Sequence, residues 1–415
     1  MTKILISALF LLALLSFISC SESPCDCDRP SITIGALLPL SGSASSIGES
    51  ANVALEIAKK EIDEYIAAYK EDYELKLVIA DTETNPEVAL QKMKELSAQG
   101  IKVFVGPFGS GEVQFVKQFA DENDLLILSP ASVAISLAIE GDNIFRFVPS
   151  DLFLAKAITR YCDNESFERI IPLYRDDVWG NDMLSSLKNE LILSESTMAD
   201  GIKYNPTTSD FSQILSQLND IVAAELNSNP TSEVSIFMAS YGEGTAILEE
   251  ASKYADLAKV KWIGSSAYAL EHSILSPANN AAATFAIDRD FVCPIMGYDE
   301  SSAPKAEQLL VQISQETGNK ANIYSLTAYD ALWVAVYTVF SAGTDANIVT
   351  LKEKLVIEAV KYTGATGNTA LNAVGDRVKG DYDFWGLEYD NGATKFSWVK
   401  VARYLAEQDE IVEIF

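Results

Sequence analysis

The sequence is poor in histidine and in positive charge. It has a single histidine, His272, so a hydrolytic triad that depends on an imidazole would have to use that residue. Lysine and arginine number 31 against 59 aspartates and glutamates, and the net charge of -28 makes nucleic acid a poor partner. No phosphate-loop or dinucleotide fingerprint and no cluster of His and Cys that could hold zinc is present, so we expect neither a cofactor nor a metal.

Cysteine is also scarce, and the five cysteines indicate little. Cys25 and Cys27 are too close in sequence for an unstrained mutual bridge. Cys162 and Cys293 could pair outside the cytoplasm. However, Cys293 follows an apolar, strand-like run, and a free cysteine is often a small core residue. Both outcomes fit the sequence.

The N-terminus has the pattern of an export signal. Lys3 precedes an apolar run over residues 4–17, which is too short to span a bilayer. The run ends in Ile18-Ser19-Cys20, which resembles the lipobox of secreted lipoproteins, in which the cysteine is lipidated and becomes the mature N-terminus. The alternative is an ordinary signal peptide with an incidental cysteine.

The lipobox predicts where the protein resides. We expect a signal peptide over residues 1–19, a lipid at Cys20 that anchors the chain to the membrane, and a polar tether over residues 20–30. The protein would then be extracytoplasmic, either periplasmic or on the cell surface. No second long apolar run follows, so no later segment is expected to span a membrane.

Three apolar runs stop abruptly in small residues. Residues 34–40 lead into Ser41-Gly42-Ser43, residues 103–105 into the glycine-rich loop 106–111, and residues 126–128 into Ser129-Pro130-Ala131-Ser132. Such runs predict buried parallel strands, whose carboxyl-end loops gather at one sheet edge and form a ligand crevice. Serine hydroxyls and free backbone N–H groups suit an anion such as a carboxylate, especially where a helix begins next, as from Glu112.

Strand-like and helical patterns alternate along the chain, which predicts an α/β fold with parallel units. We expect helices over residues 49–69, 86–99 and 111–123, the second of them capped by Asn85. After residues 145–151 the cycle restarts, with strands over 169–173, 234–238 and 260–263 and a helix over 179–193. The restart predicts two lobes rather than one sheet, because single cores stop growing beyond about 250 to 300 residues.

An ordered series of short motifs extends from Ser31 towards the C-terminus. It comprises residues 34–42 with Ile47-Gly48-Glu49, Ala80-Asp81 with Asn85-Pro86, Gly106-Pro107 with Ser110, Ser129-Pro130-Ala131, Phe145-Arg146 with Pro149-Ser150-Asp151, Trp179-Gly180, Asp210-Phe211-Ser212, Ala328-Tyr329-Asp330-Ala331 and Gly375-Asp376-Arg377. The series resembles the type I periplasmic binding proteins, specifically the branched-chain amino acid group of ABC transporter substrate-binding proteins. Single motifs are weak, but their succession is specific.

The resemblance implies two Rossmann-like lobes joined by three crossovers, with the ligand clamped between them by hinge closure. The crossovers should fall near residues 147–150, near 273–283 and after 375. One lobe would then hold residues 31–148 and about 280–378, and the other residues 149–279 and about 379–415. The partners implied are a small-molecule ligand and an ABC permease that recognises the closed form.

The resemblance also assigns ligand-binding residues in the first lobe. Ser110 occupies the position of a serine that binds the ligand carboxylate, and Ala131 and Ser132 would present backbone groups to the ligand. Val133 departs from the family, since a threonine hydroxyl usually stands there. Serines in such loops also cap helices, and that alternative stays open.

In the second lobe, Trp179 and Tyr241 would present aromatic rings to the ligand, although Trp179 could equally be a core aromatic. Ser266 stands where amino acid binders carry an acidic residue for the ligand's ammonium. A buried ammonium without a carboxylate is costly. We therefore expect the best ligand to be a small polar carboxylate, amide, urea-like compound or aromatic acid rather than a branched-chain amino acid. The acidic residues that could substitute for Ser266 are Asp176, Asp177, Glu243 and Glu271.

Two other classes of protein remain as alternatives. A hydrolase would have to rely on the Ser185 and Lys188 pair, which fits S-x-x-K, or on His272, and neither lies in a nucleophile-elbow pattern. No catalytic residue is therefore assigned. The same two-lobed fold also serves in sensors and in scaffold lipoproteins of the cell envelope.

Overall fold

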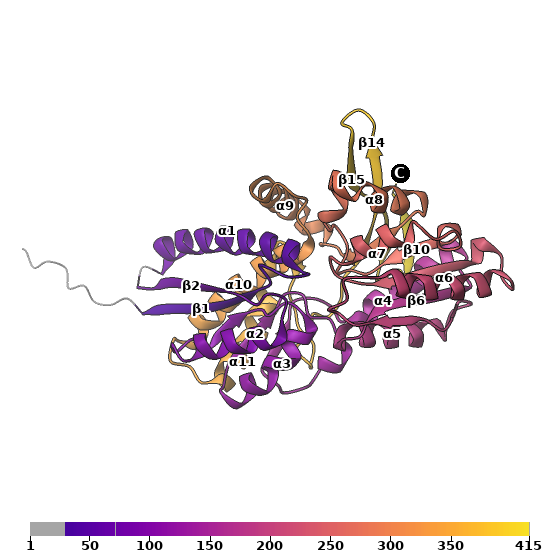
Figure 1. The fold of residues 1–415 in the computed structure, drawn as a ribbon. Coiled ribbons are helices and arrows are strands. Elements are labelled where there is room, and N and C mark those ends of the chain that lie inside the picture. The colour runs from indigo at the N-terminus through magenta and orange to yellow at the C-terminus, as the bar shows by residue number, and fades with distance from the viewer. Residues whose placement is uncertain (1–29, 71, 415) are drawn as a thin grey trace, which may run out of the picture.

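The computed structural model describes residues 30–70 and 72–414, which form two lobes lying side by side (Figure 1). The predicted signal peptide, its Cys20 and all but the last residue of the predicted tether lie outside the described residues. Each lobe consists of one sheet with helices on both faces.

The first lobe is built on a five-stranded, wholly parallel sheet in the order β2-β1-β3-β4-β5. Its strands are β1 (Ser31–Leu38), β2 (Glu74–Asp81), β3 (Val103–Val105), β4 (Leu126–Ser129) and β5 (Ile144–Arg146). In β1, Ile34 and Ala36 pack on one face of the sheet, whereas Leu37 packs on the other. Both faces are covered, so the predicted strands are apolar without interruption.

Helices from distant parts of the chain cover this sheet. α2 (Pro86–Ser97) and α3 (Ser110–Glu122) pack together on one face, while α1 (Ser45–Tyr69) packs against α10 (Ile323–Ala342) on the other. α9 (Ala303–Thr317) and α11 (Ile348–Lys361) flank α10. Figure 1 shows the orange α10 beside the indigo β1 and α1, so the lobe is completed by chain that follows the second lobe.

The helix α10 is long and apolar enough to cross a membrane by length and composition. In the structure, however, 89% of its most apolar 18-residue stretch is buried. It carries Asp330 and packs between α1 and α11 against the first sheet. These contacts describe a core helix, which is apolar all round because protein surrounds it.

The second lobe contains a nine-stranded mixed sheet, in which β16-β15-β14-β11-β10-β9-β6-β7 are successive neighbours and β8 also pairs with β6. Its parallel part comprises β6 (Arg169–Arg175), β7 (Thr197–Met198), β8 (Ile202–Tyr204), β9 (Val234–Ala239), β10 (Lys261–Gly264) and β11 (Val292–Met296). An antiparallel extension follows, with β14 (Tyr382–Asp390), β15 (Lys395–Leu405) and β16 (Glu410–Glu413). A separate hairpin of β12 (Thr363–Gly364) and β13 (Gly367–Asn368) follows α11.

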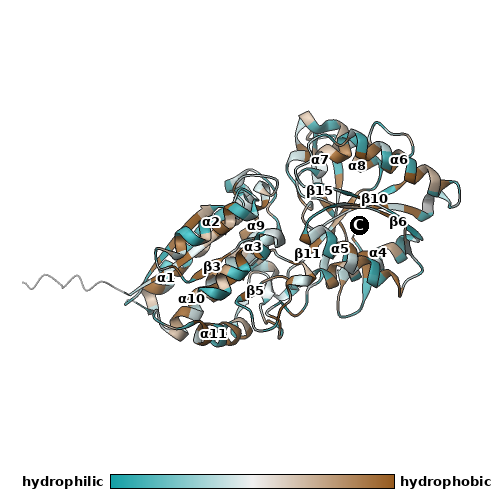
Figure 2. Ribbon diagram, turned by 60° about the horizontal axis from the view of Figure 1, so that its bottom comes forward, coloured by the Kyte–Doolittle hydropathy of each residue, from teal (hydrophilic) through white to brown (hydrophobic). Residues whose placement is uncertain are grey.

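Helices lie on both sides of this second sheet, as Figure 2 shows. α4 (Asp151–Glu165) and α5 (Val178–Leu191) pack together on one side, whereas α6 (Ser212–Leu226), α7 (Gly244–Ala251) and α8 (Asn280–Asp288) lie on the other. The side chains that face the sheet from α5 include the buried Met183 and Leu187, at the spacing of one helical face.

The second crossover lies later than predicted. We expected it near residues 273–283, but β11 pairs with β10 and β14 and therefore still belongs to the second sheet. The chain returns to the first lobe only after Met296, through the turn η6 (Glu300–Ser302) that leads into α9. The predicted lobe boundary near residue 280 is thus wrong, because residues 277–288 form a short turn and α8, which packs on β14.

A buried ion pair joins the first and third crossovers. Arg146, at the end of β5, donates from Nε to Asp376 Oδ1 and from Nη2 to Asp376 Oδ2, each at 2.5 Å. Both side chains are almost fully buried, and the two residues also form a β-bridge. The next residue, Arg377, donates to Thr366 Oγ1 at 2.5 Å, and that hydroxyl in turn donates to Asp330. The late sequence motifs thus build the hinge side of the first lobe.

Local predictions agree with the structure except at helix ends. Asn85 caps α2 by accepting from the backbone N–H groups of Glu87 and Val88. The first helix begins at Ser45 rather than at residue 49, and its N-cap Ala44 makes no side-chain cap bond that the sequence could reveal. Cys162 and Cys293 are both buried, free thiols within the described residues. Of the two possibilities left open by the sequence, they are therefore core residues and not a disulfide.

Candidate ligand-binding site

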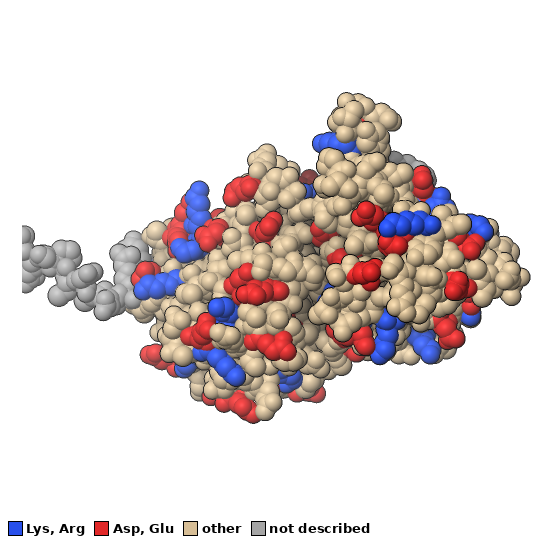
Figure 3. Space-filling view, viewed as in Figure 1, with Lys and Arg blue, Asp and Glu red and all other residues tan. Residues whose placement is uncertain are grey.

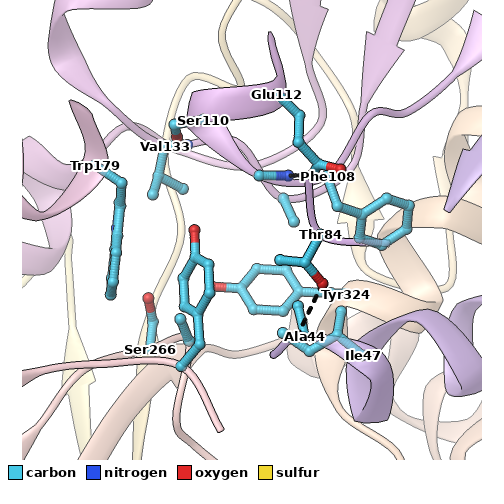
Figure 4. A pocket seen from close by; sticks show the side chains of 14 residues that line it. Ala44, Ile47, Thr84, Phe108, Ser110, Glu112, Val133, Trp179, Ser266 and Tyr324 are labelled. Atoms are coloured by element: carbon cyan, nitrogen blue, oxygen red, sulfur yellow. Dashed lines mark hydrogen bonds between the residues drawn. The ribbon is translucent and has the colours of Figure 1, made fainter. Parts of the chain in front are cut away.

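The facing edges of the two sheets enclose a small cavity of about 40 Å³, which in this arrangement has room for only a few water molecules. Figure 4 shows Trp179 and Ser266 on one side of it and Glu112, Phe108 and Thr84 on the other. The loops that follow strands of both sheets contribute, as expected for the ligand crevice of an α/β fold. The lining residues are Ala44, Ile47, Thr84, Phe108, Gly109, Ser110, Glu112, Ala131, Val133, Trp179, Tyr241, Ser266, Ala267 and Tyr324.

A cluster of serines forms the first-lobe side of the cavity. The Ser110 hydroxyl lies 3.1 Å from that of Ser132 and accepts from the backbone N–H groups of Val133 and Ala134, each at 3.3 Å. Because both acceptor positions of Ser110 Oγ are occupied, its one hydrogen points to Ser132 Oγ in this structure and would have to turn away from it to donate to a ligand. Ser132 lies behind Ser110, and its own N–H is bonded to Ser129 Oγ, so it does not line the cavity.

Aromatic rings form the second-lobe side. Trp179 stacks on Tyr241 with ring centroids 5.0 Å apart. The Tyr241 ring also makes a cation–π contact with Arg175, whose guanidinium lies 4.2 Å from the ring centre. Trp179 is in the first turn of α5, next to Gly180. A Cβ on Gly180 would lie 2.1 Å from the backbone oxygen of Arg175, so this glycine lets the helix begin close to β6.

Glu112 is the one acidic residue among those that line the cavity. It stands at the third position of α3, where its Oε2 accepts from the backbone N–H of Gly109 at 2.7 Å, which caps the helix. Its Oε1 is buried, and the buried hydroxyl of Thr82 is the other donor beside the carboxylate. Burial raises the pKa of Glu112 to about 7, a rise that nearby hydrogen bonds only partly offset.

The acidic residues considered as substitutes for Ser266 are engaged elsewhere. Asp177 caps α5, Glu243 accepts from Arg175 and Tyr204, and Asp176 pairs with Lys203 at the surface. Glu271 accepts from Ser46 Oγ at 2.6 Å. The carboxylate that lines the cavity is instead that of Glu112, which comes from the first lobe.

Of the six residues proposed as ligand contacts, the structure brings five to the cavity, namely Ser110, Ala131, Trp179, Tyr241 and Ser266. Sequence reasoning missed Glu112, although its place three residues after Gly109 is a capping-box signal. It also missed Tyr324, which begins α10 after the cap Asn322 and comes from far along the chain. No local pattern could have assigned that tyrosine to the cleft.

Comparison with known families identifies the chain. The model of the receptor family ligand binding region matches residues 50–390. The chain belongs to this ligand-binding family. Its fold is that of the type I periplasmic binding proteins, so the family and the fold indicated by the sequence motifs are both confirmed.

Individual relatives of this periplasmic binding protein agree over almost their whole length. An uncharacterized protein of Methanocaldococcus jannaschii is 29% identical over 393 residues, which cover 88% of this chain and 91% of that protein. An ABC transporter substrate-binding protein from Desulfitobacterium hafniense, solved in complex with Leu, has a TM-score of 0.66 at 21% identity and covers 89% of this chain and 100% of its own. A solute-binding protein of an ABC transporter from Rhodopseudomonas palustris was solved with 3,4-dihydroxybenzoic acid. It has a TM-score of 0.73 at 16% identity, and the match covers 91% of this chain and 98% of that chain.

Direct hydrogen bonds hold the two lobes of this binding protein together around the cavity. The backbone N–H of Gly242 donates to Ser43 O at 3.0 Å, and Ser46 bonds to Glu271 as described. On the other side, the N–H of Ser136 donates to Asp182 Oδ2 at 2.8 Å. These bonds run from the first lobe to the second, so the structure is a closed form of the hinge.

The residues weighed for hydrolysis do not meet at one site. Ser185 Oγ donates to Asn181 O within α5, and His272 Nε2 lies 3.1 Å from Lys320 O. Neither Ser185, Lys188 nor His272 lines the cavity between the lobes. Across residues 30–70 and 72–414, no group of three or more His, Cys, Asp or Glu side chains is arranged to hold a metal ion.

Proposed function

We propose that this periplasmic binding protein is the extracytoplasmic solute-binding lipoprotein of an ABC importer, and that its lobes close on a small polar or amino-acid-like ligand. The observation that carries the proposal is the cavity enclosed between the two sheets, with polar and aromatic side chains from both lobes. A ligand that touches both lobes binds the closed state more tightly and shifts the population towards it. The closed form is then the one that a permease recognises.

A two-step screen tests this function. Urea, acetamide, leucine, isoleucine, benzoate, 4-hydroxybenzoate and 3,4-dihydroxybenzoate are added separately to the purified protein, and its melting temperature is measured. A true ligand at a hundred times its Kd stabilises the folded state by about 2.7 kcal/mol. The same compound should lower the radius of gyration measured by small-angle X-ray scattering. A compound that stabilises without closing the protein binds elsewhere, and closure by none of the tested ligand classes would contradict the proposal.

The lipid anchor has its own test. Cys20→Ser should move the protein from the membrane fraction to the soluble fraction, because the thiol that carries the lipid is lost. The measurement is fractionation of expressing cells followed by detection of the protein. Cys25→Ser, five residues further on in the tether, is the matched control and should stay with the membrane. A Cys20→Ser protein that remains in the membrane fraction would refute the anchor.

A further inference from the structure

We propose that Glu112 binds a protonated amine of the ligand, so that the cleft selects compounds with a cationic group. This inference rests on the proposed solute-binding function and narrows its ligand class. It assigns the ammonium to a carboxylate of the first lobe instead of to one of the four acidic residues considered as substitutes for Ser266.

The geometry of Glu112 points to a ligand rather than to a purely structural role. Its side chain is only 2% exposed, and its Oε2 accepts from the backbone N–H of Gly109, which is a neutral donor. The buried hydroxyl of Thr82 is the other donor beside the carboxylate, and no cationic side chain pairs with it, although the side chain lines the cavity. A buried carboxylate that only neutral donors face is costly to ionise, and a cation in the cavity would offset that cost.

The rest of the cavity wall also suits a cation. Phe108, Trp179, Tyr241 and Tyr324 all line it, and aromatic faces attract ammonium groups. No lysine or arginine lines the cavity in the part of the chain that the structure describes. A purely anionic ligand would therefore meet Glu112 without a cationic side chain to offset the repulsion.

A second hollow adjoins the cavity and shares Glu112, Thr84, Gly109 and Tyr241 with it. It has a volume of about 440 Å³, and its lining adds three further carboxylates, those of Glu83, Glu87 and Asp177. The one basic side chain there, Arg175, already pairs with Asp177 and Glu243. Acidic residues also outnumber basic ones in the whole chain, and Figure 3 shows them spread over both lobes. The electrostatic field in this hollow thus favours cations.

A carboxylate on the same ligand is compatible with this arrangement. The Ser110 hydroxyl accepts two backbone N–H groups, so it can only donate to a ligand, by turning its hydrogen away from Ser132 Oγ, and it lines the cavity on the same lobe as Glu112. A zwitterion would therefore place its ammonium at Glu112 and its carboxylate at Ser110. An amine without a carboxylate would use the first contact alone.

The ionisation of Glu112 gives the inference a pH signature. With a pKa of about 7, the side chain is mostly protonated at pH 6 and mostly ionised at pH 8. The charged and titratable groups around it are Asp81 at the end of β2 with Glu83 after it, Arg175 at the end of β6 with Asp177 after it, and Tyr241 after β9. A cation requires the ionised form, so affinity for an amine should rise about tenfold from pH 6 to pH 8. A neutral or anionic ligand should show no such rise.

The experiment uses the full chain and two series of compounds, each of which keeps one carbon skeleton and varies its amine and carboxylate groups. One series is phenylalanine, 2-phenylethylamine and 3-phenylpropanoate, and the other is leucine, 3-methylbutylamine and 4-methylpentanoate. Their affinities are measured by calorimetry on the wild type, on Glu112→Gln and on Glu122→Gln at pH 6 and pH 8. Glutamine at position 112 can still cap α3, since the capping box accepts either side chain. Glu122, at the exposed end of the same helix, is the control.

We expect the amine-bearing members to bind at least tenfold more tightly than the matched acids. Glu112→Gln should weaken amine binding by about tenfold or more and abolish its rise with pH, whereas Glu122→Gln should change neither. If the acids bind more tightly, or if Glu112→Gln binds amines as the wild type does, this inference is overturned. Closure around an acid or a benzoate would overturn it while leaving the solute-binding function intact. Failure of every compound in both screens would overturn that function as well.

Discussion

Asp376→Asn is expected to lower the free energy of unfolding by about 3 to 5 kcal/mol. The substitution leaves the Arg146 guanidinium, only 1% exposed, without its counter-charge between the first and third crossovers. Removing one partner of a buried pair costs that much because the other charge remains desolvated. Urea unfolding of the purified protein gives the value, and the loss is a large part of the stability of an ordinary domain.

Two further variants distinguish the cost of a buried, unpaired charge from the contribution of an ion pair as such. Glu407→Gln breaks the Lys379–Glu407 contact, whose side chains are more than half exposed, and should cost no more than about 1 kcal/mol. Arg146→Met combined with Asp376→Leu removes both charges and should recover most of the loss, since apolar replacements of buried pairs are often neutral. An Asp376→Asn protein as stable as the Glu407→Gln control would show that Arg146 is not buried as described.

Trp179→Ala is expected to weaken ligand binding by about 2 to 4 kcal/mol, the range for a central aromatic of an interface. Trp179 is buried in the closed form, stacks on Tyr241 and lines the cavity. The cavity walls separate when the lobes open. We therefore expect the substitution to lower ligand affinity more than it lowers the free energy of unfolding. Calorimetry with the compound that closes the wild type measures the first, and urea unfolding measures the second.

Trp385 provides the control for this variant. It lies on β14 beneath Lys320, outside the cavity between the lobes, so Trp385→Ala should leave ligand affinity unchanged. Trp179→Phe keeps an aromatic ring against Tyr241 and should recover part of the binding. Wild-type affinity in Trp179→Ala would remove this tryptophan from the ligand site.

The sequence predicted the regular elements well where their patterns are local. The apolar runs before Ser41, Gly106 and Ser129 are strands β1, β3 and β4, because strands buried on both faces are apolar throughout. The second crossover was misplaced because β11 has the same kind of apolar pattern as every other central strand. Its pairing with β10 and β14 depends on partners that no local pattern identifies.

The ligand site, too, was predicted only in part from the sequence. The order of the motifs was sufficient to select Ser110, Ala131, Trp179, Tyr241 and Ser266, all of which reach the cavity because loops after parallel strands meet at one edge. Spacing along the chain could not show that Ser110 Oγ already accepts two backbone N–H groups, nor that Ser132 lies behind it. Those facts depend on where the side chains point after the loops pack.

By itself, then, the sequence determined two α/β lobes of one ligand-binding family, an acidic chain and the strand-end loops that supply the cleft. Only the tertiary structure decided that Asp376 neutralises Arg146, that Tyr324 reaches the cavity and that Glu112 lines it without a cationic partner. The reason is physical. Hydrophobic periodicity is encoded locally, within a few residues, whereas the pairing of a buried charge is set by groups up to 230 residues away that meet only when the lobes are packed.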